Sequence, residues 1–150
     1  MTTTTSHRPV VAITNVTSTQ IDTGKLLLRV TLGILLLLHG IAKLNGGIDG
    51  VMGLLTKAGL PATLGYLVYV GEVLAPVLLI VGLWTRVAAW IVVGNMLVAV
   101  ALVHLGDFGK MTPQGGWALE LQAFFLITAV VVALIGAGRY SVGGVNDRWN

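Results

Sequence analysis

Polar and apolar residues are segregated into long blocks along this chain of 150 residues. The apolar blocks cover about residues 26–44, 62–83, 87–105 and 117–137, and short connections rich in Gly, Asn or Pro separate them. Each block approaches the ~20 residues that an α-helix needs to cross the hydrocarbon core of a bilayer. The pattern therefore predicts an all-α, integral membrane four-helix bundle.

One helical segment is too short to cross a membrane. Apolar residues recur at helical spacing between residues 48 and 58, and Gly59, Leu60 and Pro61 follow them. A glycine followed by proline is typical of a helix end. We expect a short helix that lies at the membrane interface between the first and second spans.

The polar ends of the chain predict two tails around one membrane domain. Residues 1–24 are rich in Thr, and we expect them to form a disordered cytoplasmic tail. Residues 25–138 are expected to form the four-helix domain, and residues 139–150 are expected to form a cytoplasmic C-terminal tail. Four spans place both tails on one side, and the side richer in Lys and Arg is normally cytoplasmic. That side carries Arg8, Lys25, Arg86, Arg139 and Arg148, against Lys43, Lys57 and Lys110 on the other.

Composition supports the membrane class and excludes several chemistries. Hydrophobic residues make up 55% of the chain and charged residues 10%, whereas a soluble domain carries about 25% charged residues. The net charge of +3 is spread over loops and helix ends, so nucleic acid is not an expected partner. The absence of Cys excludes thiol chemistry and Cys-ligated metal within this chain.

The first span carries polar groups on one face. At about 100° per residue, one narrow sector of this helix collects two cations and two glycines, with His39 at its edge. The residues in this sector are Arg29, Gly33, Leu36, Gly40 and Lys43. Charged residues within a membrane span usually face the bundle interior, and glycines let a neighbouring helix approach closely. The remaining spans are expected to pack against this stripe.

Further polar residues follow in the other spans. Glu72 lies near the middle of the second span, and Asn95 lies in the third. The residues expected to share the outer half of the bundle are His39, Lys43, His104 and Glu120. A carboxylate at the depth of Glu72 needs a partner or a proton, and Lys43 and His39 are the candidates. We therefore expect a polar cavity in which these groups bind a ligand or exchange protons.

Each polar residue also has a structural interpretation. Lys43, His104 and Glu120 are near span ends, where side chains commonly reach the interface. Arg29 is expected either to bind lipid phosphates or to bind backbone carbonyls in the region of Arg86 and Arg139. Asn95 is expected to form an interhelical hydrogen bond. It lies nine residues before His104, so on a regular helix the two would face opposite sides.

The order and spacing of short motifs resemble the DoxX family. These motifs are R-x3-G-x5-HG-x2-KL from Arg29, G-L-P from Gly59, G-L-W-T-R from Gly82, N-M before His104, and G-A-G-R-Y-S from Gly136. The resemblance covers about residues 24–143 and implies a four-helix membrane protein of bacteria or archaea. The family pattern marks Arg29, Gly33, Gly40, Lys43, Glu72, Arg86, His104, Glu120, Gly138, Arg139 and Ser141. Many members have an acidic residue near Ser141, where this chain has Gly143 and Gly144.

The resemblance implies an accessory or small subunit of a respiratory-type, quinone-linked oxidoreductase complex, which in some members answers oxidative stress. Quinone reduction needs a proton donor, such as His39 or Lys43, and Glu72 is suited to exchange those protons. No flavin, iron–sulfur or Cys motif occurs in the chain, so the electrons are expected to come from a partner subunit. Two other classes stay open, namely a scaffolding protein, alone or as a homo-oligomer, and a small proton-coupled transporter that uses Glu72. Axial ligation of haem by His39 and His104 would require both to face one cavity.

Overall fold

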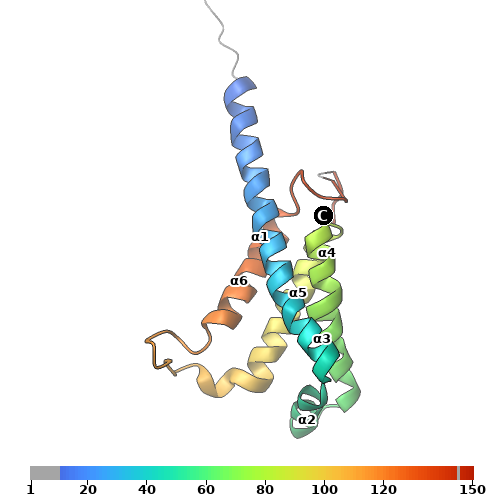
Figure 1. Cartoon of the computed structure of the whole chain (residues 1–150), viewed down its shortest axis with the longest axis vertical. Coiled ribbons are helices and arrows are strands. Elements are labelled where there is room, and N and C mark those ends of the chain that lie inside the picture. Colours follow the sequence, from blue (N-terminus) through green and yellow to red (C-terminus); the bar gives the residue numbers. More distant parts are fainter. Residues whose placement is uncertain (1–10, 145) are drawn as a thin grey trace, which may run out of the picture.

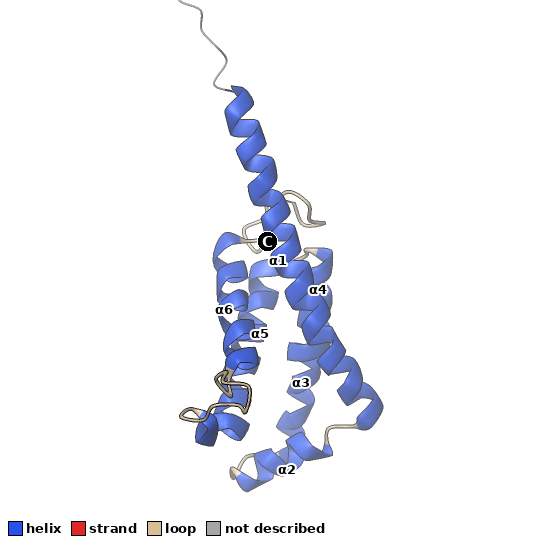
Figure 2. Cartoon of the chain, turned by 60° about the vertical axis from the view of Figure 1, so that its left-hand side comes forward, coloured by secondary structure: helices blue, strands red, loops and turns tan. Residues whose placement is uncertain are grey.

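The computed structural model describes residues 11–144 and 146–150, and its regular elements are all helical. In chain order these are α1 (Val11–Gly46), α2 (Asp49–Lys57), η1 (Ala62–Tyr66), α3 (Leu67–Tyr69), η2 (Val70–Leu74), α4 (Ala75–Val81), α5 (Thr85–Ala99), η3 (Val100–His104), η4 (Leu105–Asp107) and α6 (Glu120–Ile135). Here η1 and η4 are 3₁₀ turns, whereas η2 and η3 are π-helical. The predicted all-α class is confirmed (Figures 1 and 2).

Three stretches of the described chain are long and apolar enough to cross a membrane. They are Ser18–Gly46, Ala62–Val81 and Thr85–Asp107, here called the first, second and third spans, and α6 is a shorter apolar helix. The second span joins η1, α3, η2 and α4, and the third joins α5, η3 and η4. These helices pack as a bundle, α1 against α4 and α5 against α6.

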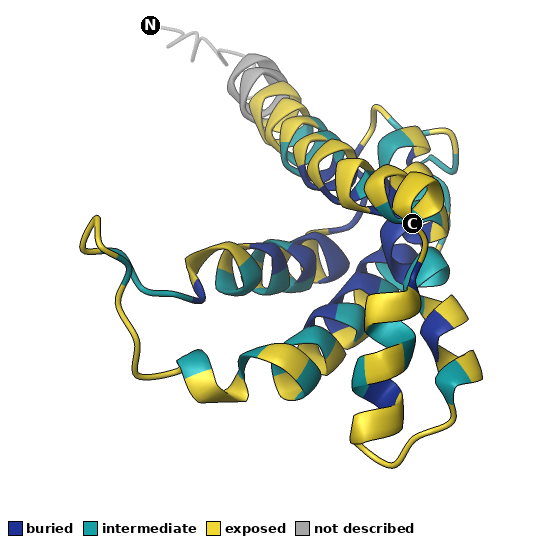
Figure 3. Ribbon diagram, turned by 60° about the horizontal axis from the view of Figure 1, so that its bottom comes forward, coloured by how far each residue is buried: buried dark blue, intermediate teal, exposed yellow. Residues whose placement is uncertain are grey.

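Small residues line the contacts between the helices. Ala75, Ala88, Ala89 and Ala129 are fully buried, beside larger core residues such as Leu79. Small side chains let helix backbones approach, which in lipid provides the packing that holds a bundle together. In Figure 3 the buried positions lie on the faces that the helices turn toward one another.

Different segments of the chain lie at the two ends of the bundle. The N-terminal half of α1, the turn between α4 and α5 and the C-terminal segment lie at one end, here the tail end (Figure 1). The other end, here the loop end, contains α2 and the loop between η4 and α6 (Figure 2). Asp22 Oδ1 accepts a hydrogen bond from Arg139 N at 3.2 Å, so the segments that flank the bundle at both ends of the chain meet at the tail end.

The predicted stripe of the first span is buried against the second span. Arg29 and Leu36 are each 1% exposed. A Cβ added at Gly33 would lie 2.9 Å from Pro76 O, and one added at Gly40 would lie 2.1 Å from Glu72 O. Both glycines therefore allow a backbone approach that no other residue permits.

A proline explains why the second span is irregular beside Gly40. Pro76 has no N–H to donate to the carbonyl of Glu72, four residues earlier in the sequence. The helix forms the π turn η2 here, in which Ala75 N donates to Val70 O. The carbonyl of Glu72 faces Gly40, so the same proline shapes both the helix and its contact with α1.

The first helix begins earlier than predicted. Residues 11–24, expected to be part of a disordered tail, are helical and continuous with the first span. Each residue added to an existing helix gains a backbone hydrogen bond without the cost of nucleation, and Thr23 Oγ1 also donates to Thr19 O at 2.8 Å. Residues 1–10 of the predicted tail lie outside the described residues.

The short helix after the first span is present as α2, and it packs against η1. Gly59 adopts φ +76°, while Gly59 N donates to Thr56 O and Leu60 N to Leu55 O. These two hydrogen bonds form a Schellman motif. The motif favours glycine at this position because the residue must adopt a left-handed backbone conformation. The helix end predicted at Gly59 is confirmed.

The fourth helix is shorter than predicted. The sequence predicts a span at residues 117–137, whereas α6 has 16 residues, Glu120–Ile135. Trp117 belongs instead to a turn in which it forms a bridge with Met111 and Ala118 N donates to Lys110 O. Gly136 ends the helix at φ +74°. Hydrogen bonding in the preceding loop therefore sets the start of this helix.

Candidate functional site

A buried ion pair joins the first and second spans. Lys43 Nζ lies 2.5 Å from Glu72 Oε2, and the two side chains are 28% and 9% exposed. Lys43 belongs to the last turn of α1, and Glu72 to the π turn η2. The contact predicted between these two residues is therefore present. A charge-assisted hydrogen bond of this kind is stronger than a neutral one.

Local packing positions both partners. Gly40 and Lys43 are three residues apart on one face of α1, so the close approach of Gly40 to the Glu72 backbone brings Lys43 toward the Glu72 carboxylate. Tyr69 OH also donates to Lys43 O at 3.4 Å, which ties the end of α1 to the second span. The ion pair thus depends on the stripe of α1.

A cavity of about 600 Å³ adjoins Lys43, between α2, the second span and the third span. Its walls are mostly aliphatic, with Lys43, Asn95 and His104 as the polar and charged side chains among them. The volume falls within the ~300–1,000 Å³ that is usual for small-molecule sites, which likewise combine apolar walls with a few polar groups. Glu72 does not line the cavity and lies behind Lys43.

Two π-helical turns form part of the cavity wall. Val70 and Gly71 come from η2, whereas Leu102, Val103 and His104 come from η3. Figures 1 and 2 show the third span turning away from the second toward the loop end. A π turn inserts extra residues into a helix and often occurs at functional sites.

The π turn also decides where His104 faces. On a regular helix Asn95 and His104 would face opposite sides, yet both line this cavity. Because η3 has more residues per turn than an α-helix, it rotates His104 back toward the side of Asn95. The conflict between the two faces that the sequence predicts is resolved in this way.

Asn95 packs closely against the second span. A Cβ at Gly71 would lie 2.5 Å from Asn95 Cγ. Asn95 Nδ2 is buried without a hydrogen-bond partner among the described residues, so this donor does not form the predicted interhelical hydrogen bond. A buried donor that lacks a partner is costly, and Asn95 lines the cavity.

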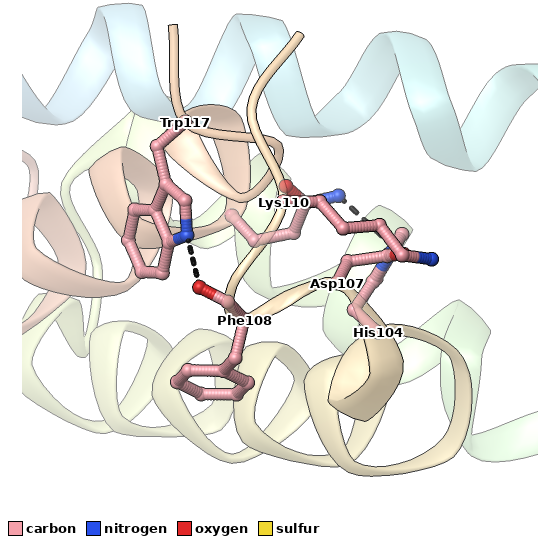
Figure 4. A network of polar contacts seen from close by, with 6 residues as sticks. His104, Asp107, Phe108, Lys110 and Trp117 are labelled. Carbon is pink, nitrogen blue, oxygen red and sulfur yellow. Dashed lines mark hydrogen bonds and ion pairs between the residues drawn. The ribbon is translucent and has the colours of Figure 1, made fainter.

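His104 is held between two polar side chains at the loop end. Its Nδ1 lies 3.1 Å from Asp107 Oδ2, and its Nε2 lies 3.0 Å from Gln122 Nε2 of α6. Asp107 also accepts a hydrogen bond from Lys110 Nζ at 2.8 Å (Figure 4). Nearby, Trp117 Nε1 donates to Phe108 O at 2.8 Å, which fixes the loop that carries these residues.

Two of the predicted site residues lie apart from the cavity. His39 is exposed, its Nδ1 lies 2.8 Å from Leu35 O, and its ring contacts Phe125 edge-on at 5.8 Å. Glu120 is exposed at the start of α6, where its Oε1 accepts a hydrogen bond from Trp117 N at 2.9 Å. Since His39 does not line the cavity, His39 and His104 do not share it as haem ligands would.

The arginines gather at the tail end. Arg29 is buried and donates to Leu79 O at 2.5 Å, to Ile80 O at 2.7 Å and to Tyr140 O. The first of its two predicted roles, binding lipid phosphates, does not match this geometry, whereas binding backbone carbonyls does. These bonds connect α1, α4 and the C-terminal segment.

Arg86 and Arg139 hold the C-terminal segment by different atoms. Arg86 Nε donates to Asn150 O at 3.1 Å and Nη1 to Ala133 O at 3.4 Å. Arg139 has an exposed side chain, and its backbone N binds Asp22. Asn150 itself is buried, and its Oδ1 accepts a hydrogen bond from Thr85 Oγ1 at 2.7 Å. The arginines therefore act at the tail end, away from the cavity.

Two residues that contact His104, namely Asp107 and Gln122, were not among the site residues predicted from the sequence. Asp107 follows His104 by three residues, and Gln122 lies in the first turn of a mostly apolar helix. Both contacts could have been predicted from the sequence. Residues three apart on a helix are neighbours, and a side-chain amide in an apolar helix needs a hydrogen-bond partner. Among the residues that the structure describes, no group of three His, Asp or Glu could hold a metal ion.

Long apolar helices that enclose an ion pair and a cavity define a multi-pass membrane protein of the helical-bundle class. The family model that matches the chain, over residues 24–105, is DoxX, and the chain belongs to the DoxX family. The chain is 31% identical over 116 residues, 77% of its length and 81% of the relative, to a Bacillus subtilis (strain 168) protein named "Putative oxidoreductase CatD". No solved structure gives a significant match.

Proposed function

We propose that this protein is a small membrane subunit of a quinone-linked oxidoreductase complex in a bacterial cytoplasmic membrane, with the tail end in the cytoplasm. The observation that carries the proposal is the cavity, which combines aliphatic walls with Lys43, Asn95 and His104. A quinone likewise combines polar and apolar parts, because the carbonyl oxygens of its ring accept hydrogen bonds and its isoprenoid chain is apolar.

The polar groups suit the two carbonyls of a quinone. Asn95 lines the cavity with a side-chain amide, which can donate and accept, and Lys43 Nζ has further protons besides the one directed at Glu72. A carbonyl that accepts hydrogen bonds from such donors is held in place and is polarised for reduction.

The electrons in this proposal come from another subunit. Reduction of a quinone to a quinol takes two electrons and two protons, and we assign the electrons to a partner oxidoreductase and the protons to this chain. The name of the Bacillus relative, an oxidoreductase, agrees with such a setting. The lipid bilayer supplies the quinone laterally, since the cavity lies between membrane spans.

A scaffolding role is the second candidate, and the Lys43–Glu72 pair favours it, because an ion pair between two spans fixes their register. A scaffold, whether bound to a partner or to copies of itself, needs no ligand in the cavity. Saturable quinone binding separates the two candidates.

The test is quinone binding to the protein purified in mild detergent. Decylubiquinone should quench Trp fluorescence saturably, and mass spectrometry of the purified protein should detect bound quinone and a co-purified oxidoreductase. Gly94 lines the cavity and has open space around its Cβ, so Gly94→Leu should fill the site and lower the affinity about tenfold.

The control places the same side chain elsewhere. Gly53 of α2 also has open space around its Cβ but does not line the cavity. Gly53→Leu should leave the affinity within about twofold of the original. Non-saturable binding, or equal losses in both variants, would reject the quinone site and leave the scaffolding role.

A further inference from the structure

The segment that leads into α6 carries a group of exposed apolar side chains. This segment, residues 105–119, contains η4 and the loop that follows it, and it is here called the α6 loop. Leu105, Phe108 and Met111 are 65%, 55% and 66% exposed, and together they are called the loop patch. Large apolar side chains that gather on a surface mark contact with another protein or with a membrane. The loop patch therefore needs an apolar surrounding.

The position of the α6 loop favours lipid as this surrounding. Figures 1 and 3 show the loop projecting sideways from the bundle. In Figures 1 and 2, which share a vertical axis, it lies level with the last turns of α1, whereas α2 lies beyond them. Since those turns belong to the first span, the loop lies at the depth at which that span leaves the bilayer.

The length of α6 gives a second reason. Its 16 residues rise about 24 Å, whereas the hydrocarbon core of a bilayer is about 30 Å thick. The last turn of α6 is held at the tail end, because Arg86 Nη1 donates to Ala133 O at 3.4 Å. The missing length of about 6 Å therefore falls on the side of the α6 loop, and residues before α6 have to complete the crossing.

Hydrogen bonds within the α6 loop lower the cost of placing its backbone at this depth. Thr112 N donates to Gly116 O at 2.7 Å, and Ala118 N donates to Lys110 O at 3.0 Å. Gly116 N also donates to the Thr112 hydroxyl at 3.1 Å. Backbone groups that are removed from water need partners within the protein, and the α6 loop provides these partners itself.

Trp117 ties the loop patch to the start of α6. Its Nε1 donates to Phe108 O at 2.8 Å, and the two rings meet edge-on with their centroids 6.0 Å apart (Figure 4). The indole N–H thus has its partner within the loop. Tryptophan is enriched where membrane and water meet, so this pair suits the interfacial layer of a bilayer.

The charges of the α6 loop do not oppose this placement. Asp107 and Lys110 are its two charged residues, and Lys110 Nζ lies 2.8 Å from Asp107 Oδ1. The two charges therefore offset one another. The Lys110 side chain is 65% exposed, and a lysine at this depth extends its ammonium group to the headgroups and water.

We propose that the α6 loop is embedded in the interfacial layer of the leaflet at the loop end, with the loop patch among the upper parts of the lipid acyl chains. The loop thereby completes the crossing that α6 is too short to make. This inference concerns the outer surface of the bundle, so it is independent of what binds in the cavity.

A fluorophore on a single cysteine tests the depth of the loop. The chain has no Cys, so Met111→Cys can be labelled alone in the full-length protein. The labelled protein is placed in phosphatidylcholine nanodiscs, which leave both faces open to water. Quenching is measured with iodide in the water and with a phosphatidylcholine that carries a nitroxide near the top of its acyl chain.

Two further positions calibrate the measurement. Phe124 is 71% exposed on the apolar helix α6, so Phe124→Cys represents lipid. Gln20 is exposed on α1, and about 39 Å of helix separates it from Gly46. Because this distance exceeds the hydrocarbon thickness of about 30 Å, Gln20→Cys represents water.

The labelled Met111→Cys should resemble the lipid reference. Its quenching by the lipid nitroxide should be within about twofold of that for Phe124→Cys and at least about fivefold above that for Gln20→Cys, with the order reversed for iodide. Iodide quenching equal to that of Gln20→Cys would place the loop in water and overturn the proposal. Shielding from both quenchers would mean that protein covers the patch, which also overturns it. If Met111→Cys does not fold, Leu105→Cys carries the same expectations.

Discussion

At the scale of single residues, the Lys43–Glu72 pair shows how this bundle tolerates charge. Each partner alone would be an isolated charge between apolar helices, which costs several kcal/mol even on lenient insertion scales. Together they are 2.5 Å apart, and Lys43 keeps 28% of its side chain accessible. The two charges therefore neutralise each other while part of the Lys43 side chain stays accessible. A ligand in the cavity could contact its ammonium group.

A double-mutant cycle measures this compensation. Lys43→Met leaves the Glu72 carboxylate buried and unpaired, so it should lower the free energy of unfolding by about 1–3 kcal/mol. Adding Glu72→Gln to Lys43→Met should recover much of that loss, because no uncompensated charge remains. Glu72→Gln alone leaves Lys43 with part of its side chain still accessible, so it should destabilise the fold less than Lys43→Met does, while it weakens quinone binding. The measurement is denaturant titration in one detergent, followed by circular dichroism.

Lys57→Met is the matched control for that cycle, because Lys57 is an exposed lysine of α2. It should change the free energy of unfolding by less than about 0.5 kcal/mol. Equal stabilities of Lys43→Met and the double variant would show that the two side chains do not interact.

The sequence was sufficient for this pair and insufficient for the rest of the site. Periodicity placed Lys43 on the packed face of α1, and the depth of Glu72 required a nearby cation. The sequence placed His104 in the same outer half but not on a definite face of its helix, because the π turn that rotates this residue depends on packing between helices. Nor could it show that Glu120 is exposed and used by the backbone of Trp117, since that contact depends on the fold of the preceding loop.

At the scale of the elements, α1 and the second span approach through glycines. Gly33 and Gly40 face Pro76 O and Glu72 O, and η2 is the π turn that forms where Pro76 cannot donate the α-helical hydrogen bond to the Glu72 carbonyl. The 100° periodicity predicted this stripe, and the predicted end of the short helix at Gly59 was confirmed. The limits of α1 and α6 were wrong, because helix propagation and loop hydrogen bonds set them.

Substitution of the glycines tests that approach. Gly40→Ala should lower the free energy of unfolding by about 1–3 kcal/mol, because its Cβ would overlap the Glu72 carbonyl. Gly24→Ala, on the same helix with nothing within 4 Å of its Cβ, should raise it by about 0.5–1 kcal/mol through helix propensity. A Gly40→Ala protein as stable as Gly24→Ala would contradict the contact. Denaturant titration of both variants makes the comparison.

At the scale of the whole molecule, the tail end and the loop end differ in what their residues contact. The tail end is held by Arg29, Arg86 and Asn150, which bind carbonyls and side chains of the C-terminal segment. The loop end contains the cavity and the hydrogen-bonded group of His104, Asp107 and Gln122. The tail end of the bundle is thus held by hydrogen bonds to the C-terminal segment, and the cavity lies near the loop end.

Labelling tests the orientation of these ends. The chain has no Cys, so single cysteines can replace Lys57, Lys110 and Arg139, all exposed. In intact cells a membrane-impermeant maleimide should label positions 57 and 110, at the loop end, and should spare position 139 until the membrane is opened. Labelling only at position 139 would reverse the orientation, and mixed labelling at 57 and 110 would contradict the placement of both at one end.

The hydrogen bonds of Arg29 also constrain how the protein enters its membrane. Arg29 and Lys43 belong to the first span, yet their partners Leu79, Ile80 and Glu72 belong to the second. During synthesis, α1 alone would present two unpaired cations to lipid. The smallest piece of chain that satisfies both is the hairpin of the first two spans. We therefore expect these two spans to enter the lipid as a pair rather than one after the other.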